Sequence, residues 1–148
     1  MVLDSALWFV IDLSLGVWLG SIAFFSFVAA PRIFRELDRG LAGDVVNSIF
    51  PAYYLVGIGL GIIAVLSALA LSQVSGFSLE VAVVIVAAIA GVVMNLYSRF
   101  VLVPKIKGAD KSRPDPSPQK FRRYHRLSVI LNGVTMVAIF IALVASHF

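Results

Sequence analysis

Four long apolar stretches, separated by polar ones, dominate the sequence. They cover approximately residues 6–30, 52–71, 79–103 and 124–145. Each is about as long as, or longer than, the roughly 20 residues with which an α-helix crosses a hydrocarbon core of about 30 Å. Prolines lie at three of the borders, at positions 31, 51 and 104. The pattern predicts an all-α, integral membrane four-helix bundle that forms a single domain over residues 1–148.

Two of the polar stretches are expected to be loops, over residues 31–51 and 104–123. In the first, Phe34, Leu37 and Leu41 share one face of a short helix, so we expect this segment to lie along the membrane surface. The second contains the run PKIKGADKSRPDPSPQK, with four prolines and five basic residues. That composition is typical of an extended loop with turns.

The positive charges are distributed very unevenly. All 12 Lys and Arg residues fall in these two loops or in the helix ends beside them, and none lies in the turn over residues 72–78 or near either terminus. The positive-inside rule therefore predicts cytoplasmic loops, external termini and a multi-pass protein of the bacterial inner (plasma) membrane. The net charge of +4 then indicates anionic lipid head groups as partners, not nucleic acid. The expected lipid contacts are Lys105, Lys107, Lys111, Arg122, Arg123 and Arg126.

Composition strengthens the membrane assignment and removes several kinds of chemistry. Hydrophobic residues make up 60% of the chain and charged residues 14%, against roughly 45–50% and about 25% in soluble domains. The absence of cysteine excludes disulfides, thiolate metal sites and cysteine nucleophiles. No phosphate-binding glycine loop, nucleophile elbow, HExxH motif or paired acidic motif is present. The motifs therefore do not indicate an enzyme.

A polar stripe enters the last apolar stretch. His125, Ser128, Asn132 and Thr135 step by three, four and three residues and so share one helix face. In the third stretch, Asn95 lies at a depth similar to that of Asn132, roughly 12 Å from the predicted helix ends at 1.5 Å per residue, and we expect the two amides to face each other. Such residues form either a ligand site or hydrogen bonds between helices. The candidate site consists of His125, Ser128, Asn132, Asn95 and Ser98.

Two further ionisable residues need an explanation. Asp12 lies about two turns inside the first stretch, in the pattern D-x-x-x-G-x-x-x-G, and is either a proton or cation site or a shallow acid that is neutral or reaches external water. His125 is the only candidate metal ligand, because His147 lies 22 residues further on, roughly 33 Å along a helix. One chain therefore cannot place both histidines on one haem, and no cofactor is expected.

Small residues are expected to bring helices together. Gly57, Gly61, Ala64 and Ala68 form a stripe of the kind that lets membrane helices approach closely. Four helices leave little room for an enclosed aqueous pathway, so a homo-oligomer is expected.

Several segments together resemble a known family. They are G-V-W-L-G and P-R-I-F at residues 16–20 and 31–34, F-P-A-Y-Y at 50–54, Asn95 followed by Pro104, and F-x-x-x-H-x-x-S-x-x-x-N from Phe121 to Asn132. Over nearly the whole chain they are similar to transmembrane protein 205 and its bacterial relatives. The resemblance implies a four-helix bundle without an agreed activity, and the link of eukaryotic members to platinum resistance implies metal or small-molecule handling.

The chain is more remotely similar to copper-resistance-D-like proteins and to the four-helix membrane protoporphyrinogen oxidase. The latter family has a histidine in its first helix, about where this chain has Ile11 and Asp12. That departure argues against haem binding and porphyrin oxidation.

Three hypotheses follow. The first is a binding or transport-type protein for a small ligand or metal ion, with its polar cluster in the cytoplasmic half of the bundle. The second is a membrane scaffold or accessory subunit in which the polar residues only hold helices together. The third is a haem- or porphyrin-linked membrane oxidoreductase, which rests on the remote similarity alone. The sequence identifies no ligand.

Overall fold

The chain is built from four membrane-length helical segments. The structure, a computed structural model, describes residues 2–109 and 118–147. Its candidate membrane spans are Val2–Glu36, Gly40–Ser75, Leu79–Gly108 and Gln119–Ala145, each long and apolar enough to cross a bilayer. No strand occurs in the described part of the chain. The prediction of an all-α four-helix membrane bundle is confirmed.

Two of the four segments consist of three helical elements each, and the other two are single helices that begin before their apolar stretches. The elements are α1 (Val2–Phe24), η1 (Phe25–Ala29), α2 (Ala30–Glu36), α3 (Arg39–Ser75), α4 (Leu79–Tyr97), η2 (Ser98–Leu102), α5 (Val103–Gly108) and α6 (Pro118–Ala145). The elements η1 and η2 are single turns of π-helix. They continue α1 into α2 and α4 into α5 without a break in the helical path.

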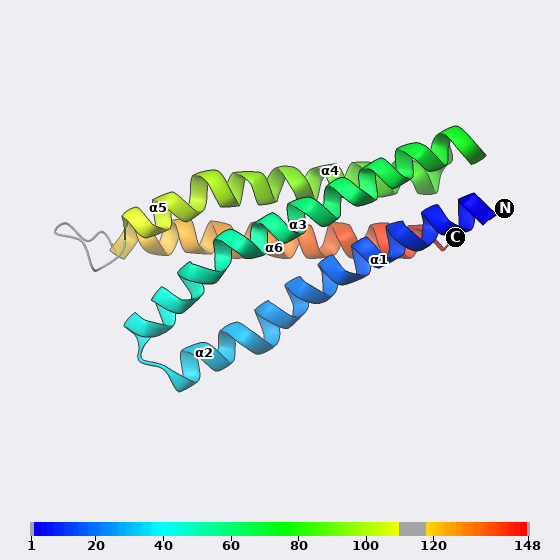
Figure 1. Cartoon of the computed structure of the whole chain (residues 1–148). Helices are drawn as coiled ribbons and strands as arrows, with labels where there is room; N and C mark the ends of the chain where they lie inside the picture. Colours follow the sequence, from blue (N-terminus) through cyan, green and yellow to red (C-terminus); the bar gives the residue numbers. More distant parts are fainter. Residues whose placement is uncertain (1, 110–117, 148) are drawn as a thin grey trace.

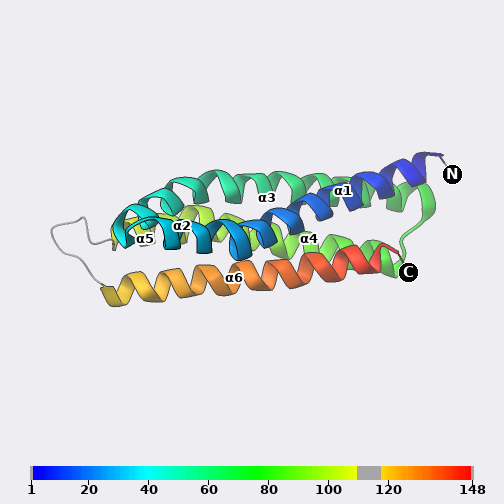
Figure 2. The same ribbon diagram turned by 90° about the horizontal axis from the view of Figure 1, so that it is seen from below.

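The helices run up and down in a closed ring. α1 packs beside α3 and α6, and α4 packs beside the same two helices. Both termini and the turn at Gly76 lie at one end of the bundle, whereas the α2–α3 connection and α5 lie at the other (Figures 1 and 2). The turn uses a glycine because its φ of 88° is unfavourable for residues with a side chain.

The middle of the bundle is filled by Trp18, which is only 1% exposed. A Cβ atom added to Gly61 on α3 would lie 2.8 Å from its Cζ3, and one added to Gly91 on α4 would lie 2.7 Å from its Cη2. The expected small-residue stripe on α3 therefore receives an indole ring from α1. By contrast, a Cβ added to Gly16 or Gly20 on α1 would meet nothing within 4 Å, so neither glycine receives a side chain from another helix as Gly61 and Gly91 do.

The helix boundaries differ from those expected over residues 31–51. α2 ends at Glu36 and α3 begins at Arg39, so the polar stretch forms the ends of two helices and a short connection instead of a surface loop. Ala42 is completely buried, which packs the start of α3 into the bundle. Pro51 consequently lies inside α3, not in its first turn.

The third segment also extends past its proline. Pro104 was expected to end the helix, but α5 continues to Gly108. A proline inside a helix clashes with the carbonyl four residues earlier and lacks the N–H that would bond to it. A π turn precedes the proline in the third segment and also in the first, where the helix continues past Pro31. The N–H of Ala30 donates to the Phe25 carbonyl and the N–H of Val103 to the Ser98 carbonyl, each five residues back. The wider turn relieves the clash, so the helix continues.

The two π turns belong to an internal repeat. FVAAPRI at residues 27–33 aligns with FVLVPKI at residues 100–106, an offset of 73 residues that also relates η1 to η2. In the second helix of each half, F-x-x-Y at residues 50–53 aligns with F-x-x-Y at residues 121–124. The bundle is therefore two similar helical hairpins, one from each half of the chain.

Candidate ligand-binding site

The bundle contains a cavity of about 280 Å³ near the end where α2 joins α3. Its walls come from the first segment, the first half of α3 and residues 125–136 of α6. The lining residues are Ile22, Phe25, Ser26, Phe27, Ala30, Phe34, Val46, Phe50, Tyr54, His125, Ser128, Val129, Asn132, Gly133 and Met136. The volume is just below the range of about 300–1,000 Å³ that is usual for small-molecule sites.

The cavity opens sideways, between α2 and α6. In the described chain, no Cα atom of α2 comes within 8 Å of one in α6, whereas α5, its counterpart in the other hairpin, approaches both α3 and α6. Figure 1 shows α2 diverging from α6. The lining residues Phe27, Phe34 and Val129 are 68%, 46% and 57% exposed. The opening is therefore bordered by exposed apolar side chains of η1, α2 and α6.

The polar wall of the cavity is the stripe on α6. Three of its predicted members, His125, Ser128 and Asn132, line the cavity. Thr135 does not line it: this side chain is completely buried and donates to the Leu131 carbonyl at 2.9 Å. The spacing of three and four residues thus correctly predicted the shared face of the first three side chains.

Hydrogen bonds fix the deeper part of this wall. The Tyr53 hydroxyl of α3 donates to Asn132 Oδ1 at 2.7 Å, and Asn132 Nδ2 donates to Ser26 Oγ of η1 at 3.3 Å. One amide therefore joins three segments. The Tyr54 hydroxyl and Ser128 Oγ share a second hydrogen bond of 2.8 Å.

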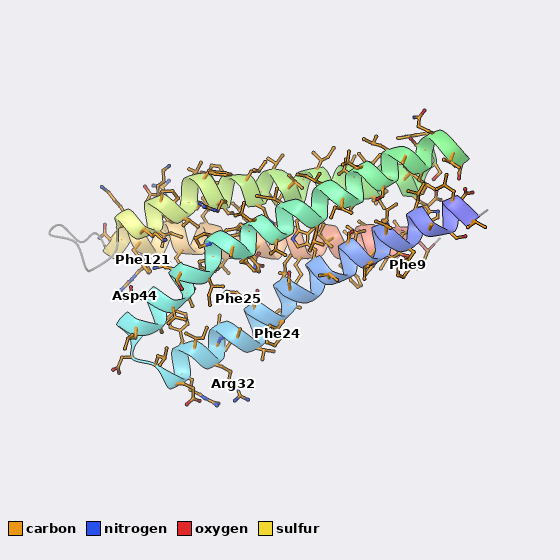
Figure 3. All side chains as sticks on the ribbon, in the orientation of Figure 1. Phe9, Phe24, Phe25, Arg32, Asp44 and Phe121 are labelled. Atoms are coloured by element: carbon orange, nitrogen blue, oxygen red, sulfur yellow. The ribbon has the colours of Figure 1, made fainter. Side chains whose placement is uncertain are left out.

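Aromatic rings form the apolar wall. Phe25 lies 5.5 Å from Phe50 and 5.3 Å from Tyr53, measured between ring centroids. Phe50 stacks on Tyr54 at 5.6 Å, with an interplanar angle of 20°. Figure 3 shows Phe25 on the side of η1 that faces α3 and Phe24 on the outer side, where it is 62% exposed. The rings thus come from two helices that meet at this level.

Asn95 and Ser98 lie outside the cavity lining, and Asn95 does not pair with Asn132. Both residues are buried, at 3% and 1% exposure. A Cβ atom added to Gly57 would collide with Asn95 Nδ2 and would lie 2.6 Å from Trp18 Nε1. The similar depth of Asn95 and Asn132 along their helices did not determine which way the two side chains point. Their directions differ because Asn95 points to the Trp18 contact on α3, whereas Asn132 points to Tyr53 and Ser26.

His125 lines the cavity where α6 begins its polar stripe. Its ring stacks on Phe121 with an interplanar angle of 5° and a centroid distance of 6.0 Å. Among the described residues, no group of three or more His, Cys, Asp or Glu side chains could hold a metal ion. His147 lies beyond the other end of α6. The two histidines are therefore too far apart to share a ligand in one chain.

Asp12 has partners at the end of the bundle that holds the termini. Ser146 Oγ donates to Asp12 Oδ1 at 2.7 Å, and His147 Nε2 lies 3.7 Å from Asp12 Oδ2. The Asp12 side chain is 28% exposed. The carboxylate is therefore shallow and tied to the C-terminal residues, away from the cavity.

The basic residues expected to meet lipid lie at the opposite end. Lys105 Nζ of α5 sits 5.6 Å from the ring centroid of Tyr124, a cation–π distance that joins α5 to α6. Arg122, Arg123 and Arg126 lie in the first turns of α6. Lys111 lies outside the described residues.

The sequence reasoning missed Tyr53, Tyr54 and Ser26 as parts of the site. Tyrosines near a helix end fit the interfacial aromatic belt equally well, and a serine in an apolar helix carries no periodic signal. The internal repeat was an available signal, because the offset of 71 residues that relates the second helices of the two hairpins aligns Tyr54 with His125.

Comparison with known proteins gives a family but no activity. Residues 13–115 match the family model described as "Domain of unknown function (DUF4149)". An uncharacterized protein of Aquifex aeolicus (strain VF5) is 34% identical over 118 residues, which is 80% of this chain and 80% of that protein. No solved structure matches the chain.

Proposed function

Because the chain belongs to the DUF4149 family, whose description assigns no activity, we propose its function from the cavity: a multi-pass membrane protein that binds a small, mainly apolar ligand taken from the lipid phase. The main support for this proposal is that one cavity combines an aromatic wall, the polar side chains of α6 and an opening between α2 and α6. A few placed polar groups within an apolar lining are typical of small-molecule sites.

The proposal favours one part of the first hypothesis from the sequence. A small ligand suits the lining, whereas a metal ion would need more donors than the single imidazole of His125 and neutral oxygens provide. Movement of the ligand across the membrane would need a second opening, so we propose binding alone. The resemblance to transmembrane protein 205, which is more specific than the DUF4149 family, stays a prediction and is not needed for this proposal.

A filling mutation tests the proposal. Gly133 lines the cavity, and a Cβ added to it would meet nothing within 4 Å, so Gly133→Leu should occupy the space without collapsing the bundle. We would measure fluorescence of N-phenyl-naphthylamine, a small apolar aromatic probe, with purified protein in lipid nanodiscs and protein-free nanodiscs subtracted. Wild type should bind the probe, and Gly133→Leu should weaken binding about tenfold or more, equivalent to 1.4 kcal/mol or more.

Gly59→Leu is the matched control. Gly59 also has nothing within 4 Å of an added Cβ, but it is exposed on α3 and outside the cavity lining. This variant should bind the probe like wild type. Equal affinities of Gly133→Leu and wild type would refute the cavity as the binding site.

The second hypothesis, a scaffold, is also favoured by a specific observation. Asn132 and Ser128 hydrogen-bond to tyrosines of α3, so both already connect helices, as packing residues do. If they serve only this purpose, Asn132→Leu should lower the melting temperature while Gly133→Leu leaves every property of the protein unchanged.

A further inference from the structure

The charge of the cavity lining limits the occupant. The lining contains no Lys, Arg, Asp or Glu. An ion bound at this depth would have no opposite charge beside it, and an unpaired charge inside a bilayer is costly. The ligand that fits is therefore uncharged.

Free hydrogen-bond donors define its polar atoms. An amide nitrogen carries two protons, and Asn132 Nδ2 uses one toward Ser26. The Tyr54 and Ser128 hydroxyls bond to each other at 2.8 Å, and Tyr54 also has a hydrogen bond with Ser98. The other amide proton of Asn132 has no partner within the described chain. A neutral His125 ring supplies a further N–H.

The exposed lining and the aromatic walls define its shape. Phe25, Phe50 and Tyr54 all line the cavity and pack ring against ring, and aromatic pairs gain most in stacked or edge-to-face geometry. A flat ring therefore fits better than a flexible chain. The gap between α2 and α6 leaves room for an apolar substituent to remain in lipid.

Resting on the proposed function, we infer that the ligand is an uncharged ring compound with oxygen acceptors, the chemistry of a quinone or an aromatic ketone. Its carbonyl oxygens accept from Asn132 or from His125. Its ring lies against the phenylalanines.

Three small compounds with the same fused ring system test this inference: naphthoquinone, naphthalene and naphthoate. Each would be used to displace N-phenyl-naphthylamine from the protein in neutral-lipid nanodiscs, with membrane partitioning measured separately and subtracted. Naphthoquinone should compete roughly tenfold better than naphthalene, since each hydrogen bond contributes about 0.5–1.5 kcal/mol net. Naphthoate, which is charged, should compete no better than naphthalene.

Variants identify the donors. Asn132→Leu and His125→Phe should each reduce the advantage of naphthoquinone and leave naphthalene unchanged. Asn47→Leu, on α3 and outside the lining, is the control and should keep the full advantage. If loss of the Asn132 hydrogen bonds unfolds the protein, His125→Phe, which retains an aromatic ring beside Phe121, decides the question.

The outcomes separate this inference from the proposed function. Equal competition by naphthalene and naphthoquinone would overturn the acceptor inference, and better competition by naphthoate would overturn the uncharged ligand; both would leave a binding cavity. Failure of the probe itself to bind wild type would overturn the proposed function and this inference with it.

Discussion

Trp18 is the residue around which the helices meet. Its ring lies against Gly57 and Gly61 of α3 and against Gly91 of α4, because only residues without a side chain leave room for an indole there. Removal of a buried tryptophan side chain typically costs about 3–5 kcal/mol. The glycines of this contact are therefore as important to packing as the tryptophan.

Gly57→Ala should destabilise the protein by about 1–3 kcal/mol, the usual cost of overpacking. The added Cβ would lie 2.6 Å from Trp18 Nε1 and would collide with Asn95 Nδ2. Gly59→Ala, two residues away and open, should be neutral or stabilising by up to about 1 kcal/mol because alanine favours helix. Thermal unfolding in detergent would measure both, and equal melting temperatures would contradict the packing argument.

The hydrogen bond between Tyr54 and Ser128 should be detectable by a double-mutant cycle. Tyr54→Phe and Ser128→Ala should show a coupling of about 0.6 kcal/mol, the average for such bonds in membrane proteins. Tyr53→Phe with Ser128→Ala is the comparison and should show almost none, because Tyr53 bonds to Asn132 instead. Unfolding free energies of the single and double variants give both couplings, and a larger value for the Tyr53 pair would refute the assignment.

For single residues, the sequence predicted the helix face on which a side chain lies better than the side chains that it contacts. Periodicity put His125, Ser128 and Asn132 on one face, and all three line the cavity. It could not predict the direction of Asn95, since depth along a helix does not fix rotation about it. Partners such as Tyr53 and Ser26 depend on how four helices pack, which no single helix pattern contains.

Among the elements, the π turns decide where the cavity lies. η1 places Phe25 and Ser26 in the site and starts α2 on its divergent path. A proline after an apolar stretch predicts the end of a helix, and the first and third helices were expected to end at Pro31 and Pro104 for this reason. A π turn before the proline removes the clash between the proline ring and the carbonyl four residues earlier. An apolar stretch followed by proline is therefore also compatible with a continuous helix.

Pro31→Ala should therefore alter ligand binding. With an N–H restored at position 31, the segment no longer requires the π turn, and a regular α-helix would rotate α2 and carry Phe34 away from the cavity. We expect weaker probe binding at unchanged or higher melting temperature. Pro51→Ala, at a proline of α3 without a preceding π turn, should bind as wild type does; equal binding by both variants would mean that packing, not the proline, maintains η1.

The whole molecule is longer than the bilayer core. Its spans contain 27 to 36 residues, whereas about 20 cross the hydrocarbon. Beyond the apolar stretches of the sequence, the spans extend through α2 and α5 and into the starts of α3 and α6, where the basic residues gather. Hydropathy and charge therefore predicted the fold class correctly, and the orientation follows from the same charges as a prediction.

Cysteine labelling would test that orientation, because the chain has no cysteine of its own. Gln73→Cys, beside the Gly76 turn, should react with a membrane-impermeant maleimide in intact cells. Lys107→Cys, on α5, should react only after permeabilisation. The reverse pattern would place the basic end outside and refute the positive-inside assignment.

The internal repeat has an evolutionary consequence. Two matching hairpins in one chain are what gene duplication and fusion of an ancestral homodimer would leave. At the 71-residue offset, Ser128 and Asn132 occupy the positions of Gly57 and Gly61, the glycines that receive Trp18. In the first hairpin these positions hold the helix contact with Trp18, whereas in the second they carry polar side chains that line the cavity.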